Sequence, residues 1–214
     1  MAGSVAEVFE LRGSEELPLR RVEEVLAAGE VVVFPTDTVY GLASRPDIPG
    51  ATARLFETKR RPRDLTLPVL AAGPEDAAGV AMFDARAWAL AGRYWPGGLT
   101  IVLPRAPRAR DWDLGTEKET VGVRVPDHAI ALALLTRTGP LAVTSANRSG
   151  EPTPATCDGI RASLGDLVAV YLCAGLAPGA VPSTVVDLTG TEARVLREGP
   201  IAPDAILDVL DGSR

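Results

Sequence analysis

The chain has 214 residues, 46% of them hydrophobic and 23% charged, and its formal net charge is −6. A chain of this length buries enough apolar surface to fold as one domain, so we expect a single domain over residues 1–214 with a core at about 15–200. The net charge argues against a general nucleic-acid-binding protein, which needs excess positive charge. No apolar run approaches the roughly 20 residues of a membrane span, and the N-terminus lacks the basic start and apolar core of a secretory signal. We therefore expect a cytoplasmic protein with no membrane partner.

The chain contains two cysteines, Cys157 and Cys173, and one histidine, His128. Neither cysteine lies in a CxxC pair or at a metal-ligand spacing, so the sequence predicts two separate thiols, buried or half-buried, in a reducing compartment. His128 is expected to cap or pack a helix. The common phosphate-loop, dinucleotide, GxSxG and HExxH motifs do not occur in the sequence. An enzyme with this composition would work by positioning its substrates and stabilising charge, as in nucleotidyl transfer.

Apolar periodicity and boundary residues predict alternating helices and strands. In chain order we expect a helix at 15–28 ending at Gly29, a strand at 31–34, a helix at 50–60, a strand at 67–70, a helix at 85–94, strands at 99–103 and 121–125, a helix from Asp127 as N-cap to about 137, a strand at 141–143, a helix at 156–164, strands at 167–172, 184–188 and 194–197, and a helix at 203–210. Several strands follow one another without an intervening helix. The sequence therefore predicts an α/β fold with an open, twisted, mixed sheet and helices packed on it.

Four polar or glycine-rich segments follow strands or helices: residues 35–42, 59–64, 144–154 and 182–187. Such positions are where α/β folds place ligands. The cations of residues 59–64 have two interpretations. They could be a solvated helix end that complements the helix dipole. Alternatively, Pro62 could pull the chain out of the helix, so that Lys59 and Arg61 converge on one phosphate group.

Each of the other segments, taken alone, also allows both a ligand-binding and a purely structural interpretation. Ser145 and Asn147 can donate to anionic oxygens or to an adenine edge, or they can simply stabilise their own turn. Thr36 and Thr38 would lie on one side of an extended segment, where they could hold a small hydroxylated amino acid or tie down a loop. Ser183, at the start of a strand, is free to face a ligand.

Seven strings in a fixed order make the chain resemble the YrdC/TsaC family of L-threonylcarbamoyladenylate synthases, from about Gly29 to Pro200. They are FPTDTVYGL, KRRP, WPGGLTIVL, TVGVRVPDH, TSANRSG, PSTVVDL and VLREGPI. The KxR…SxN signature of that family falls on Lys59, Arg61, Ser145 and Asn147. The resemblance is to the short form, which has no extra C-terminal domain.

The resemblance implies a role for each site residue. Lys59, Arg61, Ser145 and Asn147 would be catalytic and would contact the nucleotide phosphates or the transferring group. The ATP site would be completed by Thr120, Thr153 and Arg197. The threonine site would consist of Thr36, Thr38, Ser183 and Arg124, with Arg124 on the carboxylate. These residues would line a concave, positively charged cavity. No protein metal site is implied, because ATP would carry Mg²⁺ on its phosphates.

The implied reaction has two steps. The amine of L-threonine captures bicarbonate as a carbamate, which then attacks the α-phosphate of ATP and expels pyrophosphate. A separate transferase then uses the product to modify an adenosine beside the tRNA anticodon. One loop departs from the family pattern. Leu65 to Pro68 and Leu70 replace an Asn-Pro-Leu and a following histidine, which leaves the contacts of this loop open.

Three other functions compete with the synthase. The main alternative is an RNA-binding YrdC-like module without synthase activity, which the acidic composition disfavours. The carbamoyl-transfer domain of hydrogenase maturation proteins would come with acylphosphatase and zinc-finger segments, and the sequence contains neither. A purely structural protein would leave the four polar segments unexplained.

Overall fold

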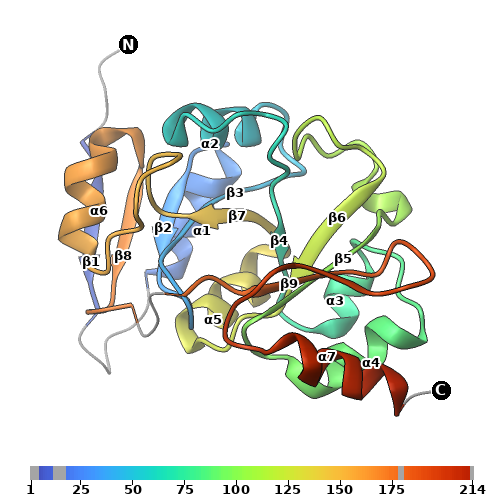
Figure 1. Ribbon diagram of the computed structural model, residues 1–214. Helices are drawn as coiled ribbons and strands as arrows, with labels where there is room; N and C mark the ends of the chain where they lie inside the picture. The colour runs from blue at the N-terminus through green and yellow to red at the C-terminus, as the bar shows by residue number, and fades with distance from the viewer. Residues whose placement is uncertain (1–4, 12–17, 178–180, 213–214) are drawn as a thin grey trace.

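In the computed structural model, which describes residues 5–11, 18–177 and 181–212, a ten-stranded sheet forms the centre of the molecule (Figure 1). The strands lie in the order β1 (Glu7–Glu10), β8 (Val170–Cys173), β2 (Val32–Phe34), β3 (Gly41–Ser44), β7 (Leu141–Ser145), β4 (Val69–Leu70), β6 (Thr120–Arg124), β5 (Leu99–Pro104), β9 (Thr184–Asp187) and β10 (Arg194–Arg197). Four neighbouring pairs are parallel and five are antiparallel. The predicted mixed, open sheet is confirmed.

Helices cover both faces of this sheet. The helices are α1 (Leu19–Ala27), α2 (Ala51–Lys59), α3 (Pro74–Ala78), α4 (Ala85–Tyr94), α5 (Ala129–Thr138), α6 (Cys157–Leu164) and α7 (Pro203–Asp211), with short 3-10 turns at Pro107–Ala109 and Gly165–Leu167. One core lies between α1, α5 and one face of β2, where Val32 and Phe34 point. Val33 points the other way, into a larger core under α2, α4 and α6. All three β2 residues are buried, as the continuous apolar run predicts.

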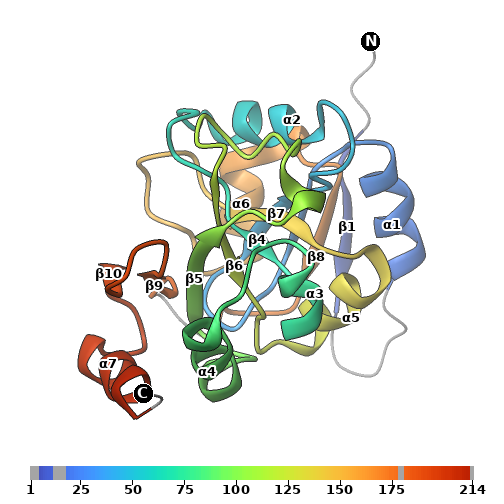
Figure 2. The ribbon, with the colours of Figure 1, turned by 90° about the vertical axis from the view of Figure 1, so that its right-hand side faces the viewer.

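The two ends of the molecule are built differently (Figures 1 and 2). Helix α6 lies beside β1 and β8 at one end, and α4 packs against α7 at the other. None of the described helices is long and apolar enough to cross a bilayer.

Most predicted elements are confirmed, with small shifts at their ends. The helix predicted for 15–28 begins at Leu19, and its residues 15–17 lie outside the described part of the chain. Two strands were not predicted. β1 is a short edge strand whose sequence EVFE carries a glutamate at each end, and β3 consists largely of small residues. β3 pairs with both β2 and β7, so the tertiary pairing decides its conformation.

The expected N-cap of α5 is wrong. His128, not Asp127, occupies the N-cap, with φ −147° and ψ 122°, and its side chain makes no capping hydrogen bond. Asp127 lies one residue too early and is exposed, so the helix begins at Ala129 without a carboxylate cap.

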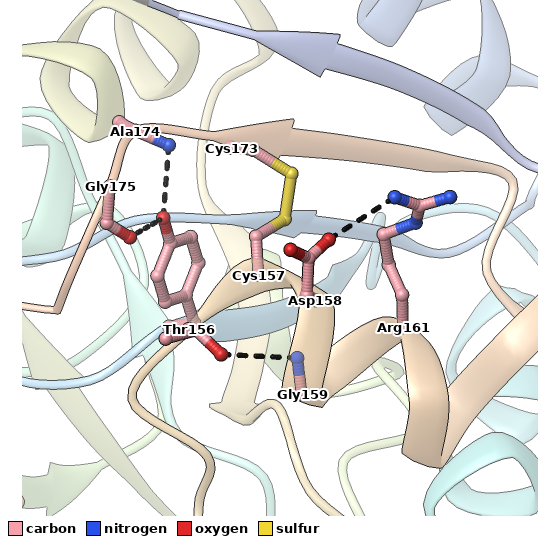
Figure 3. The surroundings of a disulfide bond; sticks show 9 residues. Thr156, Cys157, Asp158, Gly159, Arg161, Cys173, Ala174 and Gly175 are labelled. Atoms are coloured by element: carbon pink, nitrogen blue, oxygen red, sulfur yellow. Dashed lines mark hydrogen bonds and ion pairs between the residues drawn. A yellow bond between two sulfur atoms is a disulfide. The ribbon is translucent and has the colours of Figure 1, made fainter.

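The expectation of two separate thiols is also wrong. Cys157 and Cys173 form a disulfide, with Cα atoms 5.5 Å apart (Figure 3). Cys157 is the first residue of α6 and Cys173 is the last residue of β8, so the bond depends on how this helix packs against this strand. Neither the spacing of 16 residues nor the composition reveals that packing.

Candidate active site

Two adjoining cavities open along the middle of the sheet, where the predicted polar segments converge. The smaller one, of about 70 Å³, is lined by residues that include Thr36, Thr38, Tyr40 and Arg124; we call it the small compartment. The larger one, of about 380 Å³, is lined by residues that include Arg61, Thr66 and Thr120; we call it the large compartment. Both are lined by Pro68, Thr100, Thr144, Ser145, Ser183 and Arg197, which we call the shared wall.

Arg124 organises the small compartment from the end of β6. Its Nε donates to the Gly97 carbonyl at 2.9 Å, its Nη1 to Thr38 Oγ1 at 3.0 Å and its Nη2 to Asp37 Oδ1 at 2.5 Å. A guanidinium has five N–H donors, so two remain for a ligand. Burial lowers the pKa of Arg124, and the Asp37 carboxylate opposes this effect, which favours a charged donor beside the small compartment.

The turn before β3 supplies the hydroxyls of the small compartment. Thr36 Oγ1 donates to the Val39 carbonyl at 2.6 Å and lies 3.2 Å from Thr38 Oγ1, and the Thr38 amide donates to Thr36 Oγ1. Both threonines are buried. The two side chains lie together, but the backbone bends at residues 37–39 instead of staying extended as predicted, and their own hydrogen bonds hold the turn that presents them.

Two arginines give the large compartment its positive charge. Arg61 follows α2, where Arg60 takes φ 52° and ends the helix, and its guanidinium donates to the Leu65 and Thr66 carbonyls. Arg197, on β10, donates through Nε and Nη2 to the backbone oxygen and Oγ of Ser183, at 3.0 and 3.1 Å. Among the described residues neither arginine forms an ion pair, so both charges are left for an anionic ligand.

The positive charges of the arginines in the two compartments also lower one another's pKa values. Burial and then the charge of Arg197 lower the pKa of Arg61, with the Asp64 carboxylate opposing them, and burial and the charge of Arg124 lower the pKa of Arg197. Cations that repel across a cavity are stabilised when an anion binds between them.

Lys59 lies behind the shared wall, next to Ser145. Its ammonium contacts the Ser145 carbonyl at 2.8 Å, Ser145 Oγ at 3.2 Å, the Asn147 carbonyl at 2.8 Å and Asn147 Oδ1 at 2.7 Å. Only 2% of Lys59 is exposed. Burial and the charge of Arg61 lower its pKa to about 8. The KxR and SxN motifs, 86 residues apart in the chain, are thus one hydrogen-bonded unit, in which Ser145 faces both compartments.

The structure brings most of the predicted residues to the cavity. Thr36, Thr38, Arg61, Thr120, Arg124, Ser145, Ser183 and Arg197 line one or both compartments. The other three predicted site residues, Lys59, Asn147 and Thr153, line neither compartment. Lys59 and Asn147 lie behind Ser145, and Thr153 is half-buried in the segment that leads to α6.

Sequence reasoning missed several polar residues of the site, among them Asp37 and Thr100. Asp37 is paired with Arg124, and Thr100 Oγ1 lies 2.8 Å from Ser183 Oγ. A signal for Thr100 was present, because it is the one hydroxyl residue in the otherwise apolar strand sequence LTIVL. Within the described ranges, no group of three or more His, Cys, Asp or Glu side chains is arranged to hold a metal ion.

The fold and this cavity define an α/β protein with an open mixed sheet, whose two compartments are lined by Arg61, Arg124 and Arg197. A family model described as telomere recombination, for Sua5, YciO and YrdC proteins, matches residues 24–199. A Mycobacterium tuberculosis protein named putative threonylcarbamoyl-AMP synthase is 44% identical over 187 residues, which are 86% of this chain and 85% of that protein. A Bacillus subtilis protein named threonylcarbamoyl-AMP synthase is 37% identical over 190 residues, 87% of this chain and 54% of that protein.

A crystal structure of Pyrococcus abyssi Sua5 complexed with L-threonine is similar with a TM-score of 0.87 and 34% identity, over 97% of this chain and 61% of that one. The chain therefore belongs to the Sua5/YciO/YrdC family. It spans between half and two thirds of the Bacillus and Pyrococcus proteins.

Proposed function

We propose that this protein is a threonylcarbamoyl-AMP synthase, a nucleotidyltransferase that forms threonylcarbamoyl-AMP and pyrophosphate from L-threonine, bicarbonate and ATP. The observation that carries the proposal is the pair of compartments with one shared wall. A small site with a buried arginine suits an amino acid, and a larger site with two arginines unpaired to any described carboxylate suits a nucleotide. Their common wall is where the two substrates would react.

L-threonine would bind in the small compartment. Its carboxylate would take the two N–H donors of Arg124 that the protein leaves unused, in a charge-assisted pair. Its hydroxyl would meet the Thr36 and Thr38 hydroxyls, and Ser183 would contact it from the shared wall. The complex of Pyrococcus abyssi Sua5 with L-threonine supports an amino acid in this fold.

ATP would bind in the large compartment, with Mg²⁺ entering on its phosphates as part of the substrate. Arg61, Arg197 and the Thr120 hydroxyl are among the donors that line this space. Ser145 would face the phosphates, with its turn held by Lys59 and Asn147 from behind the shared wall, and Thr153, in the segment that leads to α6, would complete the nucleotide site. The oxygen ligands that Mg²⁺ prefers are then supplied by ATP and water.

The reaction would proceed at the shared wall. The threonine nitrogen attacks the carbon of bicarbonate, and loss of water leaves a carbamate. One carbamate oxygen attacks the α-phosphorus of ATP as the bond to the bridging oxygen breaks, and pyrophosphate leaves with the bonding electrons. Negative charge develops on the phosphoryl oxygens, where Arg61 and Arg197 stabilise it without reorganising.

The product is a mixed anhydride, which suits group transfer to another molecule. We propose that a separate transferase consumes it to form threonylcarbamoyladenosine next to the tRNA anticodon. The protein would act in the cytoplasm, where tRNA is modified. Residues 1–214 would form one catalytic domain.

The test is a pyrophosphate-release assay with purified protein, L-threonine, bicarbonate and labelled ATP, with mass spectrometry of the product. We expect release only when all three substrates are present, together with a product of the mass of threonylcarbamoyl-AMP. Omitting threonine or bicarbonate should reduce release to background. Release that does not depend on both would refute the synthase. Tight binding of tRNA without release would support the RNA-binding module.

A further inference from the structure

Thr100 occupies a central position in the site. It lies in β5, is 5% exposed, and lines both compartments as part of the shared wall. Its Oγ1 is 2.8 Å from Ser183 Oγ, which also accepts a hydrogen bond from Arg197 Nη2 at 3.1 Å. Three side chains from three neighbouring strand segments thus meet at one hydroxyl.

The sheet holds Thr100 in place. Thr100 pairs with Val185 of β9, two residues beyond Ser183, so the strand register sets the distance between the two hydroxyls. On the other side lies Gly122 of β6, where an added Cβ would come within 3.1 Å of the Thr100 methyl group. A side chain at position 122 would therefore crowd the Thr100 methyl group. Because residue 122 is a glycine, the Thr100 side chain has room for its observed rotamer.

The donors and acceptors of this group can be counted. Each hydroxyl has one proton and two lone pairs, and the bond between Thr100 and Ser183 uses one of their two protons. If Thr100 donates, Ser183 Oγ accepts from both Thr100 and Arg197, and the Ser183 proton is left. If Ser183 donates, the Thr100 proton is left. Among the described residues no other acceptor is bonded to either hydroxyl, so one O–H donor remains at the shared wall.

We propose that Thr100 is a positioning residue that fixes this remaining O–H, beside the Arg197 guanidinium, onto an anionic carboxylate-type oxygen of the amino-acid substrate or its carbamate. The inference rests on the proposed function, because it takes the small compartment as the amino-acid site. When Thr100 donates, both lone pairs of Ser183 Oγ are occupied, so the Ser183 hydroxyl can only donate toward the cavity, and in either arrangement the spare proton favours an anionic oxygen there. The neighbouring guanidinium adds the matching charge.

Thr100→Val tests the proposal, because it replaces the hydroxyl with a methyl group of nearly the same shape. We expect kcat/KM for L-threonine and the affinity for L-threonine, measured by calorimetry, to fall about tenfold, while the KM for ATP changes less than about twofold. Thr100→Ser keeps the hydroxyl and is the matched control. It should stay within about threefold of the wild type in both measurements.

Ser183→Ala completes a double-mutant cycle with Thr100→Val. If Thr100 acts through Ser183, the double variant should be no worse than the more impaired single variant. Multiplicative losses, a Thr100→Ser variant as impaired as Thr100→Val, or unchanged threonine affinity in Thr100→Val would each overturn the proposal. So would a wild-type protein that does not bind L-threonine. A wild type that binds L-threonine but releases no pyrophosphate would refute the synthase, while the binding series would still decide the role of Thr100.

Discussion

At the scale of single residues, Lys59 joins two distant motifs. Its three N–H donors face four oxygen acceptors of Ser145 and Asn147, all within 3.2 Å. The ammonium therefore has no donor to spare for a phosphate while the turn keeps this geometry. In this geometry Lys59 holds the Ser145 turn, and we propose that its protonation state controls how firmly the turn is held.

We expect activity to fall as the pH rises through about 8, because the pKa of Lys59 is lowered from 10.5 to about 8 and its deprotonation removes a donor. The protein itself should not unfold over this interval. Between about 8 and 10.5 the unfolded state binds more protons at Lys59 than the folded state, so this group makes the free energy of unfolding rise with pH. The measurements are the pH profile of turnover and the melting temperature at each pH.

Arg61→Gln supplies the control for that profile. The charge of Arg61 is the second cause of the lowered Lys59 pKa, after burial, so its removal should move the alkaline limb to higher pH even though the absolute rate falls. An alkaline limb at the same pH in Arg61→Gln would show that another group titrates.

How far the sequence predicts individual residues depends on how local their partners are. Thr36 and Thr38 interact within one turn, so their proximity could be predicted from the sequence, although the prediction assumed an extended backbone that the structure does not have. The contacts of Lys59 with Asn147 and of Thr100 with Ser183 span 88 and 83 residues, so they exist only after the sheet has formed. Motif spacing could place these residues near a ligand but could not show which of them contact one another.

At the scale of elements, the disulfide joins α6 to β8 next to the site. Near the disulfide, the segment before Cys157 and the segment after Cys173 also meet, because the Ala177 amide donates to the Ala155 carbonyl. The Tyr40 hydroxyl joins the same corner, because it donates to the Gly175 carbonyl and accepts from the Ala174 amide. Tyr40 lines the small compartment. The disulfide therefore constrains a corner of the structure that borders the small compartment.

Reduction of this disulfide should lower the melting temperature. A closed loop of about 15 residues is worth about 3 kcal/mol in the chain-entropy description, or roughly 6–12 °C for a chain of this size. Calorimetry with and without a dithiol reductant measures the difference. The double variant Cys157→Ser, Cys173→Ser should have the lower melting temperature with or without the reductant. If the wild type and the double variant have the same melting temperature in oxidising buffer, the disulfide does not contribute to the stability of the fold.

Element prediction from the sequence succeeded where the pattern is strong. The residues of α4 and β10 were predicted with the observed bounds. For α4 the reason is a clear helical spacing of apolar residues, with Pro96 soon after its end. Element prediction failed at β3, whose residues 41–44 have little strand propensity but lie fully buried between β2 and β7. In this strand, tertiary pairing outweighs intrinsic preference.

At the scale of the whole molecule, the alternation of helices with adjacent strands was enough to predict a mixed open sheet. The strand order was not predicted, because most of its pairings join segments far apart in sequence. That order places β3, β7, β4, β6, β5 and β9 side by side, and these strands carry or adjoin the residues of both compartments. The cavity is thus a product of topology, and its two halves should respond separately to ligands.

We expect MgATP and L-threonine each to raise the melting temperature of the wild-type protein. A ligand at about a hundred times its Kd stabilises the folded state by about 2.7 kcal/mol. For a chain of this size that corresponds to roughly 5–10 °C. Differential scanning calorimetry with each ligand alone, and with both, gives the shifts.

Variants of the arginines should separate the two shifts. Arg124→Ala should abolish the shift with L-threonine and keep the one with MgATP, because Arg124 lines the small compartment and not the large one. Arg61→Ala should do the opposite. Arg60→Asn is the matched control for charge, since Arg60 is exposed and its φ of 52° is tolerated by asparagine. This control should keep both shifts. If Arg124→Ala instead loses the shift with MgATP and keeps the shift with L-threonine, the two compartments have been assigned to the wrong substrates.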